Sequence, residues 1–131
     1  MYLVFDTSVL IAATLTPNGL SSRILHLSGQ EFLPCTSDTI LEEFTRKMSE
    51  KSLLNKQFQE TLQAYRAAAI LCDNQSYSAE QISNDNHIIG CWKACGADMI
   101  VALDKKLLKR LKTMGVPAAH PSDLPHYYKQ S

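Results

Sequence analysis

Two short apolar runs in this chain each end in an aspartate. Residues 2–5 (Tyr-Leu-Val-Phe) lead directly into Asp6, and residues 99–103 (Met-Ile-Val-Ala-Leu) lead directly into Asp104. Short apolar runs without polar alternation are typical of strands that are buried on both faces of a parallel sheet. Because ligands of such sheets bind beyond the carboxyl ends of the strands, we expect both aspartates to stand where a site would form.

Strands and helices are expected to alternate along the whole chain. Turn residues and apolar runs predict strands over residues 2–5, 31–36, 99–103 and 116–119. Caps and helical spacing predict helices over residues 9–13, 21–28, 38–50, 53–71, 84–95 and 105–114. Pro34 is expected near a sheet edge, because proline cannot donate a ladder hydrogen bond. The alternation predicts a single domain over residues 1–131, an α/β fold in which a three-layer α/β/α sandwich surrounds a parallel sheet of four to five strands.

Composition and charge narrow the class of protein. Thirteen basic side chains balance thirteen acidic ones, so no overall charge attracts the protein to nucleic acid or to anionic membranes. The first residues lack the basic segment of a signal peptide, and no run approaches a membrane span, which predicts a cytoplasmic protein without membrane contact. Four cysteines are too few for a disulfide scaffold, so we expect reduced thiols, with Cys91 and Cys95 as two small buried side chains on one helix face.

A carboxylate that follows a buried strand has two explanations. Asp6 and Asp104 each precede an expected helix and could cap its first turn. Two carboxylates at one sheet edge repel each other, however, unless a cation lies between them. Glu42, Glu43 and Asp85 can reach the same edge from neighbouring helices, and an oxygen-rich set of this kind favours Mg²⁺ or Mn²⁺ over zinc.

Four segments, taken in order, carry a resemblance to a known family. They are LVFDTSVLI at 3–11, ILEEF at 40–44, NDN at 84–86 and GADMIVALDKKLL at 96–108. Together they resemble the PIN-domain family, and among its members the small VapC-like proteins that are toxin components of bacterial toxin–antitoxin systems. The resemblance implies a Mg²⁺- or Mn²⁺-dependent endoribonuclease that leaves a 5′-phosphate and a 3′-hydroxyl.

The same resemblance assigns roles to individual residues. It implies that the catalytic, metal-binding acids are Asp6, Glu43, Asp85 and Asp104. It also implies that Thr7 and Ser8 contact the substrate beside the first acid. The chain departs from the family pattern at Ser8, where asparagine is common, and at residues 102–103, where alanine and leucine replace the usual hydroxyl residue. Asp98, at the opposite end of its strand, is interpreted as structural.

An RNA substrate must be held by local positive charge, because phosphate contacts dominate affinity for nucleic acids. The expected helix 105–114 is amphipathic, with leucines on one face and bases on the other. We expect Lys105, Lys106 and Lys109 to bind substrate there, although an ordinary solvated helix face has the same pattern. His87, two residues after Asp85, is interpreted as a surface histidine.

Other functions and partners follow from the same residues. A PIN scaffold that binds RNA or a protein without cutting is consistent with the absent hydroxyl at 102–103. A receiver-like phosphate-accepting domain also has acids at a sheet edge, but it requires an acidic pair after the first strand, which Asp6 does not provide. The family resemblance further implies a homodimer and a cognate antitoxin. Leu62 and Tyr65 of the expected helix 53–71 could form the dimer interface or the core.

Overall fold

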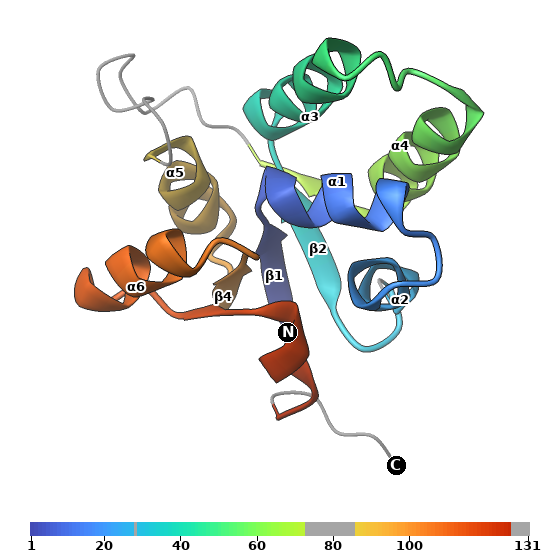
Figure 1. Cartoon of the computed structure of the whole chain (residues 1–131). Helices are drawn as coiled ribbons and strands as arrows, with labels where there is room; N and C mark the ends of the chain where they lie inside the picture. Colours follow the sequence, from blue (N-terminus) through green and yellow to red (C-terminus); the bar gives the residue numbers. More distant parts are fainter. Residues whose placement is uncertain (28, 73–85, 127–131) are drawn as a thin grey trace.

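The computed structural model describes residues 1–27, 29–72 and 86–126, and these residues form a five-stranded sheet in which every pairing is parallel (Figure 1). The strand order across the sheet is β3-β2-β1-β4-β5. The strands are β1 (Tyr2–Phe5), β2 (Leu33–Thr36), β3 (Ile70–Leu71), β4 (Met99–Val101) and β5 (Ala118–Ala119). The expected parallel sheet is confirmed, and β1 and β4 are neighbours at its centre.

Helices cover both faces of this sheet. They are α1 (Thr7–Leu15), α2 (Leu20–His26), α3 (Asp38–Glu50), α4 (Lys56–Ala68), α5 (Asn86–Cys95) and α6 (Lys105–Thr113), followed by the 3₁₀ helix η2 (Pro121–His126). Helices α1, α2 and α4 lie on one side of the sheet and α5 and α6 lie on the other, which confirms the three-layer α/β/α sandwich (Figure 1). Among the described residues, no helix combines the length and the apolar character that crossing a membrane requires.

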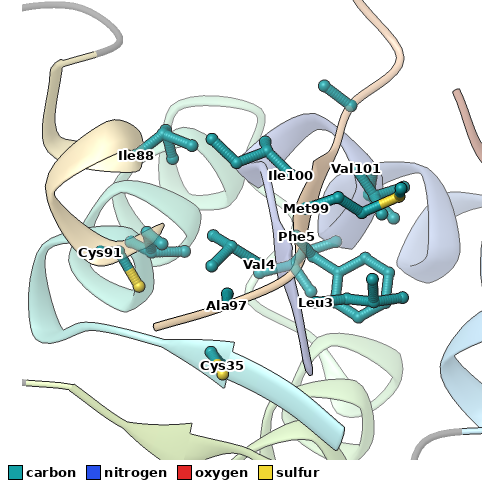
Figure 2. Close-up of a cluster of buried hydrophobic side chains, with 14 of the residues drawn as sticks. Leu3, Val4, Phe5, Cys35, Ile88, Cys91, Ala97, Met99, Ile100 and Val101 are labelled. Carbon is teal, nitrogen blue, oxygen red and sulfur yellow. The ribbon is translucent and has the colours of Figure 1, made fainter. Parts of the chain in front are cut away.

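The core is built on the alternation of side chains along β1 and β4. Val4 pairs with Ile100 in the strand register, and both side chains point toward Ile88 and Cys91 of α5 (Figure 2). Phe5, on the opposite face, contacts the ring of Tyr65 from α4 at a centroid distance of 6.4 Å. Five of these six side chains are completely buried, and the sixth, Tyr65, is 3% exposed. Burying an aliphatic or aromatic side chain contributes about 1.5–3 kcal/mol, so these layers hold both helix faces to the sheet.

The predicted elements differ from the observed ones mainly around β3. The helix expected over residues 53–71 ends at Ala68, and residues 70–71 form a short edge strand instead. Pro34 was expected near an edge, and it lies in β2, the strand next to the edge strand β3. The strand tolerates proline there because β3 pairs only with Cys35 and Thr36, so no neighbour on that side requires a donor from residue 34.

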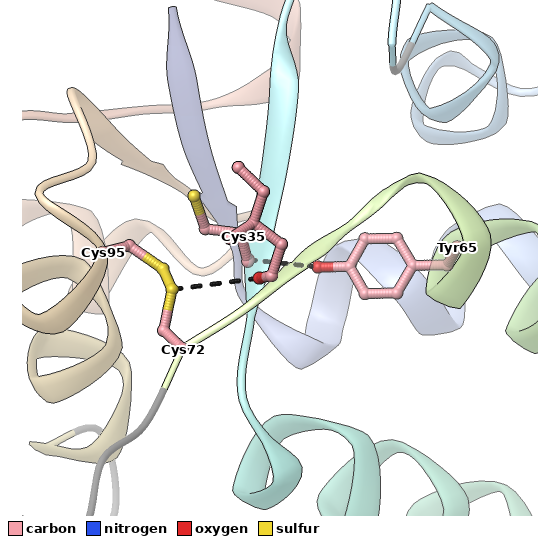
Figure 3. The surroundings of a disulfide bond; sticks show 5 residues. Cys35, Tyr65, Cys72 and Cys95 are labelled. Atoms are coloured by element: carbon pink, nitrogen blue, oxygen red, sulfur yellow. Dashed lines mark hydrogen bonds between the residues drawn. A yellow bond between two sulfur atoms is a disulfide. The ribbon is translucent and has the colours of Figure 1, made fainter.

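The expectation of reduced cysteines is also wrong for two of the four. Cys72, directly after β3, forms a disulfide with Cys95 at the end of α5, and their Cα atoms are 5.5 Å apart (Figure 3). Cys95 is half-buried rather than fully buried. Cys91 is a free thiol that is completely buried, as predicted, and Cys35 is the second free thiol. Residues 72 and 95 are separated by 23 positions, and no local pattern brings them together.

Candidate active site

Two of the predicted acids follow the two adjacent strands at the centre of the sheet. Asp6 directly follows β1 and caps α1, and its backbone N–H donates to the Val101 carbonyl at the end of β4, at 2.9 Å. Asp104 follows β4 by three residues and caps α6, accepting backbone hydrogen bonds from Lys106 at 2.8 Å and from Leu107 at 3.4 Å. Both aspartates are therefore caps, and both stand at the carboxyl edge of adjacent strands.

Ser8 connects these two strand ends. Its hydroxyl donates to Asp6 Oδ2 at 2.7 Å, and its backbone N–H approaches the same oxygen at 3.3 Å. The same hydroxyl oxygen accepts a hydrogen bond from the backbone N–H of Leu103 at 3.3 Å. Ser8 thus fixes the Asp6 carboxylate and ties it to the residue before Asp104. Among the described residues, no donor reaches Asp6 Oδ1, which leaves that oxygen available to a ligand.

Glu43 reaches the site from the second turn of α3. The hydroxyl of Thr7, which is 1% exposed, donates to Glu43 Oε1. His87, at the start of α5, places Nε2 3.6 Å from Glu43 Oε2. The carboxylate is therefore held between the first residue of α1 and a histidine that is only 5% exposed. Burial corrects the interpretation of His87 as a surface histidine.

Two other acids considered in the sequence, Glu42 and Asp98, lie away from this edge. Glu42 is exposed and lines a separate surface depression with Arg46 and Arg66, on a different face of α3 from Glu43. Asp98 accepts a hydrogen bond from the backbone N–H of Tyr2 at 2.6 Å, at the amino ends of β1 and β4, so its structural interpretation is confirmed. Asp85, the third acid of the predicted set, lies outside the described residues.

Asp6 and Asp104 have no lysine or arginine ion-pair partner in the part of the chain that the structure describes, and Glu43 lies beside His87. Among the described residues, the ion pairs formed by lysine and arginine are Arg46 with Glu50 and Lys56 with Glu60, and both are on the surface away from this edge. The carboxylate oxygens of Asp6, Glu43 and Asp104 do not come within 4.8 Å of one another as a group of three. Mg²⁺ does not require all three carboxylates within this distance, because it keeps several waters and binds through one or two carboxylates together with substrate phosphates.

A basic groove runs along α6, from its first residue to its last. Its volume is about 860 Å³, and it is lined by Lys105, Leu108, Lys109, Lys112, Thr113, His120, Ser122 and Asp123. The leucines of α6 are buried against the sheet, which leaves the lysines of the helix on the groove side. The groove brings together two of the three lysines predicted to bind substrate, Lys105 and Lys109. Lys106 is exposed but is not part of its lining.

Comparison with known proteins identifies the family. The family model of the PIN domain matches residues 2–106, so the chain belongs to the PIN-domain family. PIN domains are generally nucleases, and PIN nucleases generally use divalent metal ions. No curated protein matches the chain.

Two solved structures share the fold. One is VapBC2 from Rickettsia felis bound to a DNA fragment from its promoter, with a TM-score of 0.65 and 18% identity over 92% of this chain and 98% of that chain. The other is a PilT N-terminus domain protein from the hyperthermophilic archaeon Sulfolobus solfataricus P2, with a TM-score of 0.58 and 13% identity over 97% of this chain and 92% of that chain. At these identities the likeness establishes the fold.

The sequence alone did not reveal the contact between His87 and Glu43. A signal for the burial of His87 was nevertheless present, because Cys91 lies four residues later and shares its helix face. Ser8 was expected to contact substrate, but its hydroxyl is engaged by Asp6 and by Leu103. That role depends on the pairing of β1 with β4, which no local spacing specifies.

Proposed function

We propose that this protein is a Mg²⁺- or Mn²⁺-dependent endoribonuclease. The observation that carries the proposal is the placement of Asp6 and Asp104 at the ends of adjacent strands, which Ser8 links, with no lysine or arginine partner for either acid among the described residues. Carboxylates that only cap helices need no such placement. Membership of the PIN-domain family supports nuclease chemistry at this edge.

The residues that would hold the metal are Asp6, Glu43 and Asp104, together with Asp85. Carboxylate oxygens fit a hard divalent cation, and the scarcity of nitrogen and sulfur donors at this edge disfavours zinc. When bound, the metal would lower the pKa of a coordinated water and stabilise charge on the scissile phosphate. The products expected from the family resemblance are a 5′-phosphate and a 3′-hydroxyl.

Side chains around the acids position them for this role. The Ser8 hydroxyl occupies Asp6 Oδ2 and thereby directs Oδ1 toward a ligand. Thr7 donates to one oxygen of Glu43, and His87 Nε2 lies 3.6 Å from the other. Because each acid is held by neighbouring groups before any ligand arrives, little side-chain entropy remains to be lost when the metal and the substrate bind.

The lysines of α6 are proposed to bind the RNA backbone. Lys105 and Lys109 line the basic groove, and Lys105 immediately follows Asp104. A phosphodiester chain lying in this groove would pass directly beside the acidic edge. Lys106, on the adjacent exposed surface, could contact the same strand. RNA is the proposed substrate because it is the one implied by the family resemblance.

We also propose that this protein is a VapC-like toxin, that a cognate antitoxin neutralises it, and that it forms a homodimer in the cytoplasm. The likeness to VapBC2 supports an antitoxin partner. A groove of about 400 Å³ between α1, α2 and α4 offers small and apolar side chains to such a partner, among them Ala13, Leu25, Ala64 and Ala68. Tyr65 packs in the core, so a dimer interface on α4 must use other residues.

A PIN module that binds without cutting is the second candidate. Its support is at residues 102–103, because alanine and leucine have no hydroxyl to offer to substrate or metal. Ala102 is also completely buried, and the Leu103 N–H is engaged by Ser8.

The test compares cleavage of a mixed, end-labelled RNA pool with Mg²⁺, with Mn²⁺ and with EDTA. The nuclease predicts cutting with either metal, none with EDTA, and products whose 5′-phosphates support ligation to an adaptor. Cutting that continues in EDTA would overturn the metal-dependent mechanism. RNA retention without cutting under all conditions would favour the binding module.

A further inference from the structure

All four cysteines of the chain gather between α5 and the edge of the sheet formed by β2 and β3. Cys35 lies in β2, Cys72 follows β3, and Cys91 and Cys95 lie one turn apart on α5. The Sγ atoms of Cys35, Cys72 and Cys95 all lie within 4.8 Å of one another (Figure 3). These residues come from three separate elements, so the grouping is a product of the tertiary fold.

The spacing of these sulfurs suits a metal ion. A zinc–sulfur bond is about 2.3 Å long, so three thiolates around one ion lie about 4 Å apart. Cys72 and Cys95 are bonded to each other in the structure, and two-electron reduction frees both sulfurs within reach of Cys35. Cys35 is buried, whereas Cys72 and Cys95 are half-buried and keep part of their surface exposed among the described residues.

The surroundings of Cys35 disfavour a bare thiolate. Burial, and secondarily the negative charge of Asp98, raise the pKa of its thiol. A coordinated cation would reverse this cost, because it supplies positive charge at the sulfur. Burial and the proximity of Cys35 similarly raise the pKa of Cys91, to about 12, and the Cys91 sulfur is not part of the group of three.

We propose that the reduced chain binds one thiophilic d¹⁰ ion, Zn²⁺ or Cu⁺, through Cys35, Cys72 and Cys95. Soft thiolate ligands select these ions over Mg²⁺ and Mn²⁺, so this site is chemically distinct from the carboxylate edge. A dithiol reductant supplies the two electrons and two protons that convert the Cys72–Cys95 disulfide into two thiols. Binding of the ion then releases the protons of the three thiols. The disulfide and the metal complex are therefore mutually exclusive states of the same sulfurs.

The test uses the full chain, reduced with a dithiol and freed of reductant under anaerobic conditions. Co²⁺ serves as a spectroscopic substitute for Zn²⁺, and competition with chromophoric chelators measures Zn²⁺ and Cu⁺ separately. We expect one equivalent of ion per chain, with a sulfur-to-cobalt charge-transfer band. The ion that stays bound to the protein in competition with the chelator, Zn²⁺ or Cu⁺, is the one that the site prefers. Reoxidation to the disulfide should abolish binding.

Variants locate the site and separate it from the nuclease. Cys72→Ser and Cys95→Ser, at half-buried positions, should each lose the charge-transfer band and at least tenfold in affinity. Cys91→Ala removes a neighbouring buried thiol outside the group of three and should keep the charge-transfer band and the affinity of the parent. Asp6→Asn, at the carboxylate edge, should keep them as well. Circular dichroism establishes that each variant is folded. The proposal is overturned if the reduced protein binds none of these ions through sulfur, or if folded Cys72→Ser and Cys95→Ser bind as tightly as the parent.

Discussion

Ser8 is the residue on which the geometry of the acidic edge depends most directly. Its hydroxyl donates to Asp6 and accepts from Leu103, so one side chain joins the end of β1 to the segment before α6. The family resemblance drew attention to this position because asparagine is common there. Both residue types can donate a hydrogen bond to the neighbouring aspartate, which explains how serine serves in its place.

Ser8→Ala is expected to lower the rate of RNA cleavage about tenfold. A hydrogen bond to a charged group is worth about 1.5 kcal/mol or more, and about 1.4 kcal/mol corresponds to a factor of ten in rate. Ser8→Thr keeps the hydroxyl and should restore most of the loss. Ser49→Ala, at an exposed position of α3, is the matched control. Equal rates for Ser8→Ala and the parent would show that Ser8 does not position Asp6.

Glu43 and Glu42 provide a second contrast between single residues. Glu43→Gln should reduce cleavage at least 100-fold, because it removes a charge that Thr7 and His87 hold at the acidic edge; losses of about this size accompany removal of a single charge-stabilising group. Glu42→Gln changes an exposed neighbour and should leave the rate unchanged. The measurement is the single-turnover rate at saturating Mn²⁺. The reverse order of effects would assign the second acid to Glu42.

The sequence located residues better than it described their contacts. An apolar run that ends in an aspartate is a local pattern, and it placed Asp6 and Asp104 correctly at the carboxyl ends of β1 and β4. The burial of His87 and the engagement of Ser8 depend on how α3, α5 and β4 pack around β1, and local sequence does not encode this packing directly. The position of Asp85 remains a prediction.

At the level of elements, α6 combines a structural and a functional face. Leu107, Leu108 and Leu111 are buried against the core, while Lys105 and Lys109 line the basic groove. The helical spacing of leucines and lysines predicted this division. The same reasoning failed for β3, because a two-residue edge strand is too short to show periodicity, and the helical pattern before it extended across the boundary.

Leu111→Ala is expected to destabilise the fold by about 2–5 kcal/mol, since it opens a cavity at a completely buried position. Lys112→Ala, one residue further along, changes an exposed side chain and should alter the free energy of unfolding by less than about 0.5 kcal/mol. Urea unfolding followed by circular dichroism measures both. A small effect of Leu111→Ala would mean that α6 is not anchored through its leucines.

Removing the positive charges of the groove should weaken RNA binding in a salt-dependent manner. For single-stranded RNA, each lost phosphate contact lowers the slope of log affinity against log salt by about 0.7. Lys105→Ala combined with Lys109→Ala should therefore lower the slope by about 1.4. Lys56→Ala, which removes an exposed base from α4, should leave it unchanged. Fluorescence anisotropy over a salt series measures the slope, and an unaltered slope in the double variant would exclude this groove as the RNA path.

At the level of the whole molecule, the alternation of strands and helices was sufficient to predict a parallel sheet with helices on both faces. The strand order could not be obtained in the same way, because it depends on which elements pack together across long sequence separations. The disulfide shows the same difficulty, since Cys72 and Cys95 meet only once β3 lies beside β2 and α5 covers that edge. Tertiary packing therefore created both the acidic edge and the cysteine cluster.

The central claim is that Asp6 and Asp104 serve a metal-dependent reaction and do not merely cap helices. Asparagine caps a helix about as well as aspartate, so Asp6→Asn and Asp104→Asn remove the charge while keeping the caps. The most direct measurement combines Mg²⁺-dependent RNA cleavage with thermal unfolding of both variants. We predict that cleavage is abolished in each, with the midpoint of unfolding unchanged or raised because carboxylate repulsion is relieved. Cleavage at the parent rate by the folded variants, or loss of the fold in both, would contradict this account.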